Sequence, residues 1–198
     1  MDLVLSILLG YLIGSVSFGI IVTKLVKGVD IRQYGSGNTG VTNVLRIVGK
    51  GPAALVLAGD VLKGVSSVYI GLHLGDNSLI YAIAAGLAVI AGHTYPLYYG
   101  FKGGKGAATG FGVILALIPD VTLIAVTIFA CTILLTRYVS LGSILGSASV
   151  PVSAILLDKP LPILVFCFAA AAKRTGWANK NREQAGPTKI ENRLVQQK

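Results

Sequence analysis

Residues 107–135 read AATGFGVILALIPDVTLIAVTIFACTILL, and Asp120 is the only charged residue among them. A helix needs roughly 20 apolar residues to cross the hydrocarbon core of a bilayer, so this stretch is too long for one crossing. Pro119 and Asp120 lie near its middle, and a proline ends the helix that precedes it. The stretch therefore predicts two membrane helices joined by a tight turn.

Apolar residues dominate the rest of the chain as well. Of the 198 residues, 54% are hydrophobic and 13% are charged, and the mean hydropathy of +0.75 is well above that of a soluble domain. Further apolar runs predict spans at about residues 3–26, 52–74, 79–99, 141–157 and 160–172. We therefore expect an all-α integral membrane protein with seven transmembrane helices, in which residues 1–175 form a single membrane domain and residues 176–198 form a polar tail.

The basic residues indicate how this domain is oriented. Seven crossings place on one side the bases of the tail together with Lys24, Lys27, Arg32, Arg46, Lys50, Lys102, Lys105 and Arg137. The opposite side holds Lys159 and the acidic residues Asp2, Asp76, Asp120 and Asp158. Short loops rich in Lys and Arg remain in the cytoplasm, so we expect the N-terminus outside and the C-terminus in the cytoplasm.

Two function classes are disfavoured by the composition. The net charge of +9 and the pI near 9.7 are typical of nucleic-acid-binding domains, but here the bases are divided among short loops and no recognition module is present in the sequence. We therefore expect no nucleic-acid partner. Cys131 and Cys167 lie in apolar runs, apart from any set of ligand residues, so the sequence indicates neither a metal site nor a disulfide framework.

A glycine-rich loop follows the first span and reads GSGNTGVTNVLR over residues 35–46. Gly35, Gly37 and Gly40 permit positive φ, so backbone N–H groups can converge on an anion. Side-chain donors are supplied by Ser36, Asn38, Thr42, Asn43 and Arg46. A polar connecting loop is the simpler interpretation, but the density of donors around one arginine favours phosphate binding.

A second glycine-rich loop, FKGGKG at residues 101–106, precedes the fourth predicted span. Gly103, Gly104 and Gly106 flank Lys105, so amide donors, an ammonium group and a helix N-terminus are expected at one point. The spacing is not that of a Walker A motif. The alternative is that Lys102 and Lys105 only mark the membrane surface.

Other polar residues lie within or beside the spans. Asp60 and Lys63 are three residues apart on one face of the second span, and a structural ion pair is as plausible there as a ligand contact. His93 precedes the second loop, and we expect its ring to hydrogen-bond loop backbone. Neither histidine begins a His-x-x-x-x-Asp dyad of the kind that activates a hydroxyl in soluble-type glycerol-phosphate acyltransferases. Ser143 follows Arg137, near Gly142 and Gly146, which form a small-residue face for helix packing.

Three motifs together resemble one known family. They are GSGNTGVTN at residues 35–43, GDVLKG at residues 59–64, and GHTYP at residues 92–96 followed by FKGGKG. The chain resembles the bacterial acyl-phosphate:glycerol-3-phosphate acyltransferases, the PlsY family. The resemblance implies seven helices, no cofactor, and a cytoplasm-facing site in the bacterial plasma (inner) membrane. It also implies transfer of a fatty acyl chain from acyl phosphate to the sn-1 hydroxyl of glycerol 3-phosphate. This reaction gives lysophosphatidic acid and phosphate, the first step of phospholipid synthesis. The resemblance is also compatible with a hand-off of acyl phosphate from the enzyme that forms it.

The resemblance also suggests residue roles. Catalytic roles carry over onto Ser36, Arg46, Lys105 and Ser143. The candidate substrate-binding residues are Asn38, Thr42, Asn43, Lys63, His93, Lys102, Gly103, Gly104, Gly106 and Asn179. The C-terminal family motif is altered, because Gly176 and Thr188 stand where the family has histidine and glutamate, although Asn179, Arg182 and Gly186 keep its spacing.

Two other functions compete with acyl transfer. A small anion or phosphate transporter would place its polar site near the middle of the bilayer on interrupted helices. Asp60 and Lys63 are the only residues that favour transport, since most polar residues lie in loops on one side. An inactive membrane protein that binds the same ligands is the third possibility, and the altered tail favours it.

Overall fold

The structure is a computed structural model that describes residues 1–169, without the side chains at positions 139, 140 and 143. The predicted tail, including Gly176, Asn179 and Thr188, lies outside the described residues. Regular structure in residues 1–169 is entirely helical. The chain divides into two units, residues 1–124 and residues 125–198, and each is described by itself.

The helices follow the predicted apolar runs closely. They are α1 (Asp2–Ser15), α2 (Phe18–Lys27), η1 (Ile31–Gln33), α3 (Val41–Ile47), α4 (Lys50–Leu74), α5 (Leu79–Thr94), η2 (Leu97–Tyr99), α6 (Ala107–Leu117), α7 (Pro119–Thr136) and α8 (Val139–Leu156). Residues 161–169 are also helical. Among the described residues, four segments are long and apolar enough to cross a membrane: Asp2–Lys27, Lys50–Leu74, Leu79–Tyr99 and Pro119–Thr136. The shorter apolar helices include α6 and the end of α8.

The break expected at Pro119 is confirmed. Helix α6 ends at Leu117 and α7 begins with Pro119, so the proline occupies the first helical position. A proline fits there because the first N–H groups of a helix have no partner within the helix. The long apolar stretch is therefore two helices.

The first predicted span is not one continuous helix. Val16 and Ser17 are extended, with φ/ψ of −70°/112° and −97°/96°, and they separate α1 from α2. Val and Ser are weaker helix formers than Leu or Ala, but propensity alone does not break a helix in an apolar run. The break persists because a side chain from α4 pairs with the carbonyl groups that it frees, as described below.

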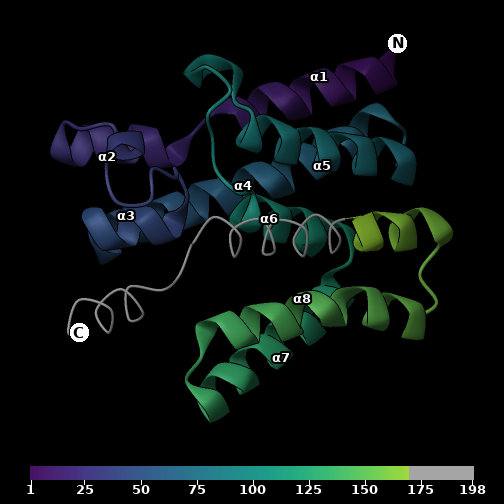
Figure 1. Cartoon of the computed structure of the whole chain (residues 1–198). Coiled ribbons are helices and arrows are strands. Elements are labelled where there is room, and N and C mark those ends of the chain that lie inside the picture. Colours follow the sequence, from purple (N-terminus) through teal and green to yellow (C-terminus); the bar gives the residue numbers. More distant parts are fainter. Residues whose placement is uncertain (170–198) are drawn as a thin grey trace, which may run out of the picture. The chain divides into compact units, whose positions relative to one another are not determined.

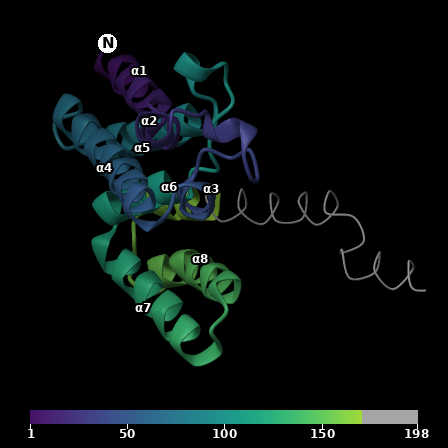
Figure 2. The same ribbon diagram turned by 90° about the vertical axis from the view of Figure 1, so that its left-hand side faces the viewer.

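Glycines bring the helices of the first unit into backbone contact. Helix α1 lies beside α5 (Figure 1), and a Cβ atom at Gly14 or Gly92 would collide with backbone of the partner helix. Gly64 of α4 and Gly112 of α6 make equally close approaches to each other's helices. Helices α2 and α3 lie against one end of α4, as Figure 2 also shows. Small residues at such crossings are typical of membrane helix packing.

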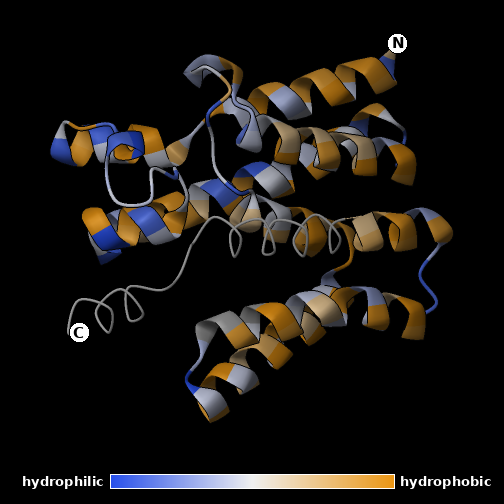
Figure 3. Cartoon of the chain, in the orientation of Figure 1, coloured by the Kyte–Doolittle hydropathy of each residue, from blue (hydrophilic) through white to orange (hydrophobic). Residues whose placement is uncertain are grey.

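Apolar residues dominate these helices (Figure 3), and many of their large side chains are exposed. Val4 of α1, Leu62 of α4 and Ile80 of α5 are 70%, 61% and 61% exposed. Soluble proteins rarely leave such extensive apolar surface in water. These faces are suited to lipid.

In the second unit, the predicted small-residue face of α8 is confirmed. A Cβ atom at Gly142 would lie 3.1 Å from the Phe129 carbonyl oxygen, and one at Gly146 would lie 3.1 Å from that of Ala125. Both partners belong to α7, so these glycines allow α7 and α8 to pack closely. The expected packing role of this segment therefore accounts for the two glycines.

Candidate active site

The first glycine-rich loop contains a helix that the sequence did not predict. Helix α3 begins at Val41, so Thr42, Asn43 and Arg46 lie on a helix rather than in an irregular connection. Gly35 and Gly37 have φ of 62° and 69°, as expected. Gly40 does not use the conformational freedom of glycine, since its φ is −80° and it directly precedes the helix.

Asn43 is the centre of this loop. It is 3% exposed, and its Nδ2 donates to the carbonyl oxygens of Tyr34 and Asn38 at 2.9 Å and of Ile31 at 3.4 Å. Its Oδ1 accepts from the Ser36 N–H at 3.1 Å. Because both ends of the amide are engaged, we revise the expected ligand contact of Asn43 to a positioning role. The loop folds around this side chain.

The remaining loop residues present their side chains differently. Ser36, Thr42 and Arg46 are exposed, whereas Asn38 is half-buried and its Oδ1 accepts from the Gly40 N–H at 2.8 Å. The exposed hydroxyls and guanidinium suit contact with a ligand at the surface of the helix bundle. Asn38 shapes the turn that leads into α3.

The second loop leaves α5 at Thr94, passes through η2 and reaches α6 at Ala107. Gly106 has φ of 76° at the N-terminus of α6, a conformation that glycine adopts without strain. Lys102 and Lys105 are exposed. Partial burial nevertheless lowers the pKa of the Lys105 ammonium below its usual value.

Gly103 and Gly104 pack against His93. A Cβ atom at Gly103 would collide with the His93 carbonyl oxygen, and one at Gly104 would collide with the imidazole Nε2. The Gly104 N–H donates to the His93 carbonyl oxygen at 3.0 Å. The expectation that this amide contacts substrate was therefore wrong, because it already has a partner in the protein.

A buried cluster of Asp60, Lys63 and His93 lies beneath this loop. These residues are 1%, 4% and 6% exposed. The predicted ion pair is confirmed, with Lys63 Nζ 2.9 Å from Asp60 Oδ1. Lys63 Nζ also lies 2.8 Å from His93 Nδ1. The expectation that the His93 ring bonds loop backbone was therefore wrong.

Lys63 also explains the break between α1 and α2. Its ammonium donates to the carbonyl oxygens of Val16 at 2.8 Å and Gly14 at 3.2 Å. A helix break inside an apolar run leaves carbonyl groups without partners, which is costly away from water. Lys63 supplies these partners from α4.

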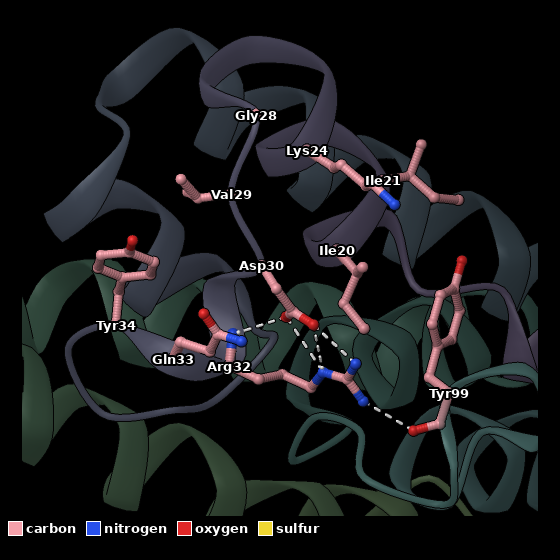
Figure 4. Close-up of a pocket in the computed structure, with 10 residues that line it drawn as sticks. All are labelled: Ile20, Ile21, Lys24, Gly28, Val29, Asp30, Arg32, Gln33, Tyr34 and Tyr99. Carbon is pink, nitrogen blue, oxygen red and sulfur yellow. Dashed lines mark hydrogen bonds and ion pairs between the residues drawn. The ribbon is translucent and has the colours of Figure 1, made fainter.

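Arg32 joins the chain segments that precede the two loops. Its Nη1 donates to the Tyr99 carbonyl oxygen at 2.8 Å, and its Nη2 pairs with Asp30 Oδ2 at 2.7 Å (Figure 4). The Arg32 guanidinium holds the pKa of the Asp30 carboxyl below its usual value. Tyr99 and Val41 both pack against one buried apolar cluster, which includes Ile31 and Val44. The two glycine-rich loops therefore begin from the same end of the helix bundle.

Sequence reasoning missed the ion pair between Asp30 and Arg32. The available signal was an acidic residue among the basic residues of this side, two positions before an arginine. Both side chains line a hollow of about 500 Å³, together with Ile20, Ile21, Lys24, Gly28, Val29, Gln33, Tyr34 and Tyr99. The predicted site residues do not line this hollow, and each nitrogen of the Arg32 guanidinium already donates to Asp30 or to the Tyr99 carbonyl oxygen. We therefore place the candidate site at the glycine-rich loops.

Two predicted residues are not joined to this site by the described structure. Ser143 lies on α8 in the second unit, and Asn179 lies outside the described residues. Ser36, Thr42 and Arg46 in the first loop and Lys102 and Lys105 in the second remain as candidate ligand-contacting side chains.

Comparison with known proteins identifies the family. Residues 4–182 match the family model described as glycerol-3-phosphate acyltransferase. This chain belongs to the glycerol-3-phosphate acyltransferase family. It is 46% identical over 169 residues to the glycerol-3-phosphate acyltransferase of Desulforamulus reducens, covering 85% of this chain and 84% of the relative. The acyltransferase of Shouchella clausii is 47% identical over 158 residues, with 79% and 77% covered.

Solved structures of this acyltransferase family share the fold. The glycerol 3-phosphate form of PlsY, an integral membrane glycerol 3-phosphate acyltransferase, superposes with a TM-score of 0.82 at 38% identity, over 94% of both chains. Its lysophosphatidic acid form gives 0.80 at 37% identity, over 94% of this chain and 93% of the other. The predicted all-α integral membrane fold and the resemblance to the PlsY family are confirmed.

Proposed function

We propose that this protein transfers a fatty acyl chain from acyl phosphate to the sn-1 hydroxyl of glycerol 3-phosphate, giving lysophosphatidic acid and phosphate. The observation that carries the proposal is the pair of glycine-rich loops at one end of the bundle, with Ser36, Arg46 and Lys105 exposed on them. Glycerol 3-phosphate and lysophosphatidic acid, substrate and product of this reaction, are the ligands that name the two related PlsY forms.

The chemistry suits a site built from fixed cations. The sn-1 oxygen attacks the carbonyl carbon of acyl phosphate, the bond from that carbon to the phosphate oxygen breaks, and phosphate leaves with the electron pair. The proton passes to a substrate phosphate, whose second pKa is about 6. The protein then needs to hold two phosphates and stabilise the developing oxyanion, without a metal or cofactor.

The residues divide these tasks as follows. Lys105 and Arg46 supply positive charge to the phosphates and the oxyanion, and Ser36 orients the substrates, a role that the family resemblance also gives to Ser143. Lys102, Thr42 and the Gly103 and Gly106 backbone add contacts at the phosphates, and the family resemblance gives Asn179 the same role. Asn38 and Asn43 hold the first loop in shape, and Lys63 and His93 lie beneath the second.

The membrane arrangement completes the proposal. Residues 1–175 form one domain that crosses a bacterial plasma (inner) membrane seven times, with residues 176–198 as a cytoplasmic tail. Support comes from helices found at each of the predicted apolar runs and from the bases beside them. The active site faces the cytoplasm, the acyl chain enters from the bilayer, and acyl phosphate comes from the enzyme that forms it.

Single-cysteine variants test the orientation. Gln33 and Asn77 are both exposed, and the proposal places them on opposite sides of the membrane. In a Cys131→Ser, Cys167→Ala background, a membrane-impermeant maleimide added outside spheroplasts should label Asn77→Cys but not Gln33→Cys. Permeabilised spheroplasts should label at both positions. Equal labelling of the two from outside intact spheroplasts contradicts seven crossings.

Donor choice tests the reaction itself. Purified protein supplied with glycerol 3-phosphate should form lysophosphatidic acid from acyl phosphate, while acyl-CoA should give a rate equal to the enzyme-free blank. Both donors carry a leaving group, but acyl phosphate is a mixed anhydride whose phosphate is held by the cations of the proposed site. Soluble-type glycerol-phosphate acyltransferases instead activate the attacking hydroxyl with a His-x-x-x-x-Asp dyad, which this sequence lacks. Comparable rates with the two donors rule out this mechanism.

Asp60 and Lys63, the residues that favoured the transporter alternative, no longer support it. Asp60 and Lys63 are paired with each other, and the ammonium group occupies the place beside the broken helix where a transported ion would bind. A protein that keeps its own cation there has no empty binding site at that position.

A further inference from the structure

Lys63 uses every donor of its ammonium group. An ammonium has three N–H bonds, and the structure gives Lys63 three hydrogen-bond acceptors: Gly14 O, Val16 O and His93 Nδ1. Asp60 Oδ1, at 2.9 Å, balances the charge as an ion pair. Lys63 Nζ also lies 5.9 Å from the centre of the Phe18 ring, at the start of α2. One side chain therefore joins α1, α2 and α5 to α4.

These contacts orient the His93 ring. When the Lys63 ammonium donates to Nδ1, the imidazole carries its hydrogen on Nε2, and the same Nδ1 lies 3.5 Å from Asp60 Oδ1. Nε2 faces Gly104, where the absence of a side chain allows the close approach. The carbonyl group of the same residue accepts the Gly104 N–H at 3.0 Å. Ring and backbone of His93 together set the position of the residue before Lys105.

Charge pairing alone does not explain this arrangement. A buried ion pair is often no more stabilising than apolar residues of the same size, so stability is a weak reason to place two charges inside a membrane span. The hydrogen bonds from Lys63 to the α1 and α2 break and to His93 provide another reason, because they tie the helix break to the second loop.

We infer that Asp60, Lys63 and His93 form a buried cluster that positions the loop bearing Lys105, and that Lys63 and His93 are positioning residues for acyl transfer. This inference rests on the proposed function, in which Lys105 meets the charge of the transition state. Misplacing a catalytic group by about 1 Å can cost roughly 10²-fold in rate. Loss of the cluster therefore lowers kcat without removing any group that touches substrate.

The test uses purified full-length protein and two readouts. The first is hydrogen exchange of the peptide covering residues 97–106, with the loop at residues 75–78 as an internal reference. The second is kcat and KM for glycerol 3-phosphate. Lys63→Met should speed exchange at residues 97–106 and lower kcat roughly 10- to 100-fold, with KM changed less than about threefold. Lys50→Met removes an exposed lysine at the start of the same helix and should change neither readout.

The double variant Asp60→Asn/Lys63→Met separates positioning from charge pairing. It removes both buried charges but still leaves the Gly14 and Val16 carbonyl groups without a donor, so Tm should rise above that of Lys63→Met without reaching that of the parent, while the fast exchange and the low kcat remain. Recovery of kcat together with Tm overturns the inference, because the pair then acts only through its charge. Unchanged exchange at residues 97–106 in the single variant also overturns it.

A second pair of variants keeps the inference testable if Lys63→Met does not fold. His93→Asn keeps an acceptor near the Nδ1 position and should retain kcat within about threefold, whereas His93→Leu should lose roughly tenfold or more. Equal kcat for the two variants overturns the inference. If the parent protein forms no lysophosphatidic acid, the proposed function fails, while hydrogen exchange still reports whether the cluster holds the loop.

Discussion

Replacing Lys105 with alanine is expected to lower kcat by roughly 10²–10³-fold, the range seen when one preorganised donor to developing charge is removed. Lys105 lies beside Gly106 at the N-terminus of α6, on a loop held by His93. The exposed ammonium can reach an anionic ligand while its backbone stays fixed. The measurement is kcat at saturating acyl phosphate and glycerol 3-phosphate, with Lys50→Ala as the matched lysine control.

The pH profile gives this prediction a second readout. Partial burial lowers the pKa of Lys105, so its charge is lost at a lower pH than that of a fully solvated lysine. Activity should therefore fall on the alkaline side below the usual lysine range. Lys105→Arg should move that alkaline limit upward, because arginine keeps its charge. Full activity of Lys105→Ala contradicts the assignment of Lys105 to the transition-state charge.

His93 is the rival as a general base, and its surroundings argue against that role. A base needs an acceptor nitrogen facing the hydroxyl that it deprotonates. Here Nδ1 already accepts from Lys63, and the neutral ring carries its hydrogen on Nε2, toward Gly104. The histidine is thus arranged to hold structure, and a substrate phosphate remains the proton acceptor in the proposed reaction.

Features set by local sequence could be predicted. The apolar runs give the helices, Pro119 separates α6 from α7, and the three-residue spacing of Asp60 and Lys63 puts them on one helical face where they pair. The glycine-rich motifs likewise identified the family, because they bring together three separate stretches of sequence. Each helix, turn or motif among these is recognised from residues that are neighbours within one stretch of sequence.

Features that depend on distant contacts could not be predicted. The break at Val16 is stabilised by Lys63, 47 positions along the chain, and no pattern within residues 3–26 reveals it. Gly104 reads as a free phosphate-binding amide until the fold brings it to His93. The short helix α3 was hidden because its residues, read alone, resemble a polar loop with a single arginine.

Asn43→Leu is expected to lower kcat/KM by roughly 10²-fold, because misplacing groups in a site by about 1 Å has effects of this size. Leucine is close to asparagine in shape but cannot hydrogen-bond. The substitution leaves the Ser36 N–H and the carbonyl groups of Tyr34 and Asn38 without their partner. An unpaired polar group costs about 1–3 kcal/mol where it is buried, and these hydrogen bonds are partly buried, so the loop should rearrange rather than keep its present form.

Asn43→Asp tests whether the effect comes from hydrogen bonding rather than from the size of the side chain. The carboxylate retains an acceptor for the Ser36 N–H but places a second oxygen against the carbonyl oxygens of Tyr34 and Asn38, so it should be about as harmful as leucine. Leu45→Ala, at an exposed position of the same helix, is the control and should stay within about twofold of the parent. The measurement is kcat/KM for glycerol 3-phosphate on protein of equal folded fraction. Parental activity in Asn43→Leu means that the loop does not depend on Asn43 and that the first glycine-rich motif is shaped by its glycines alone.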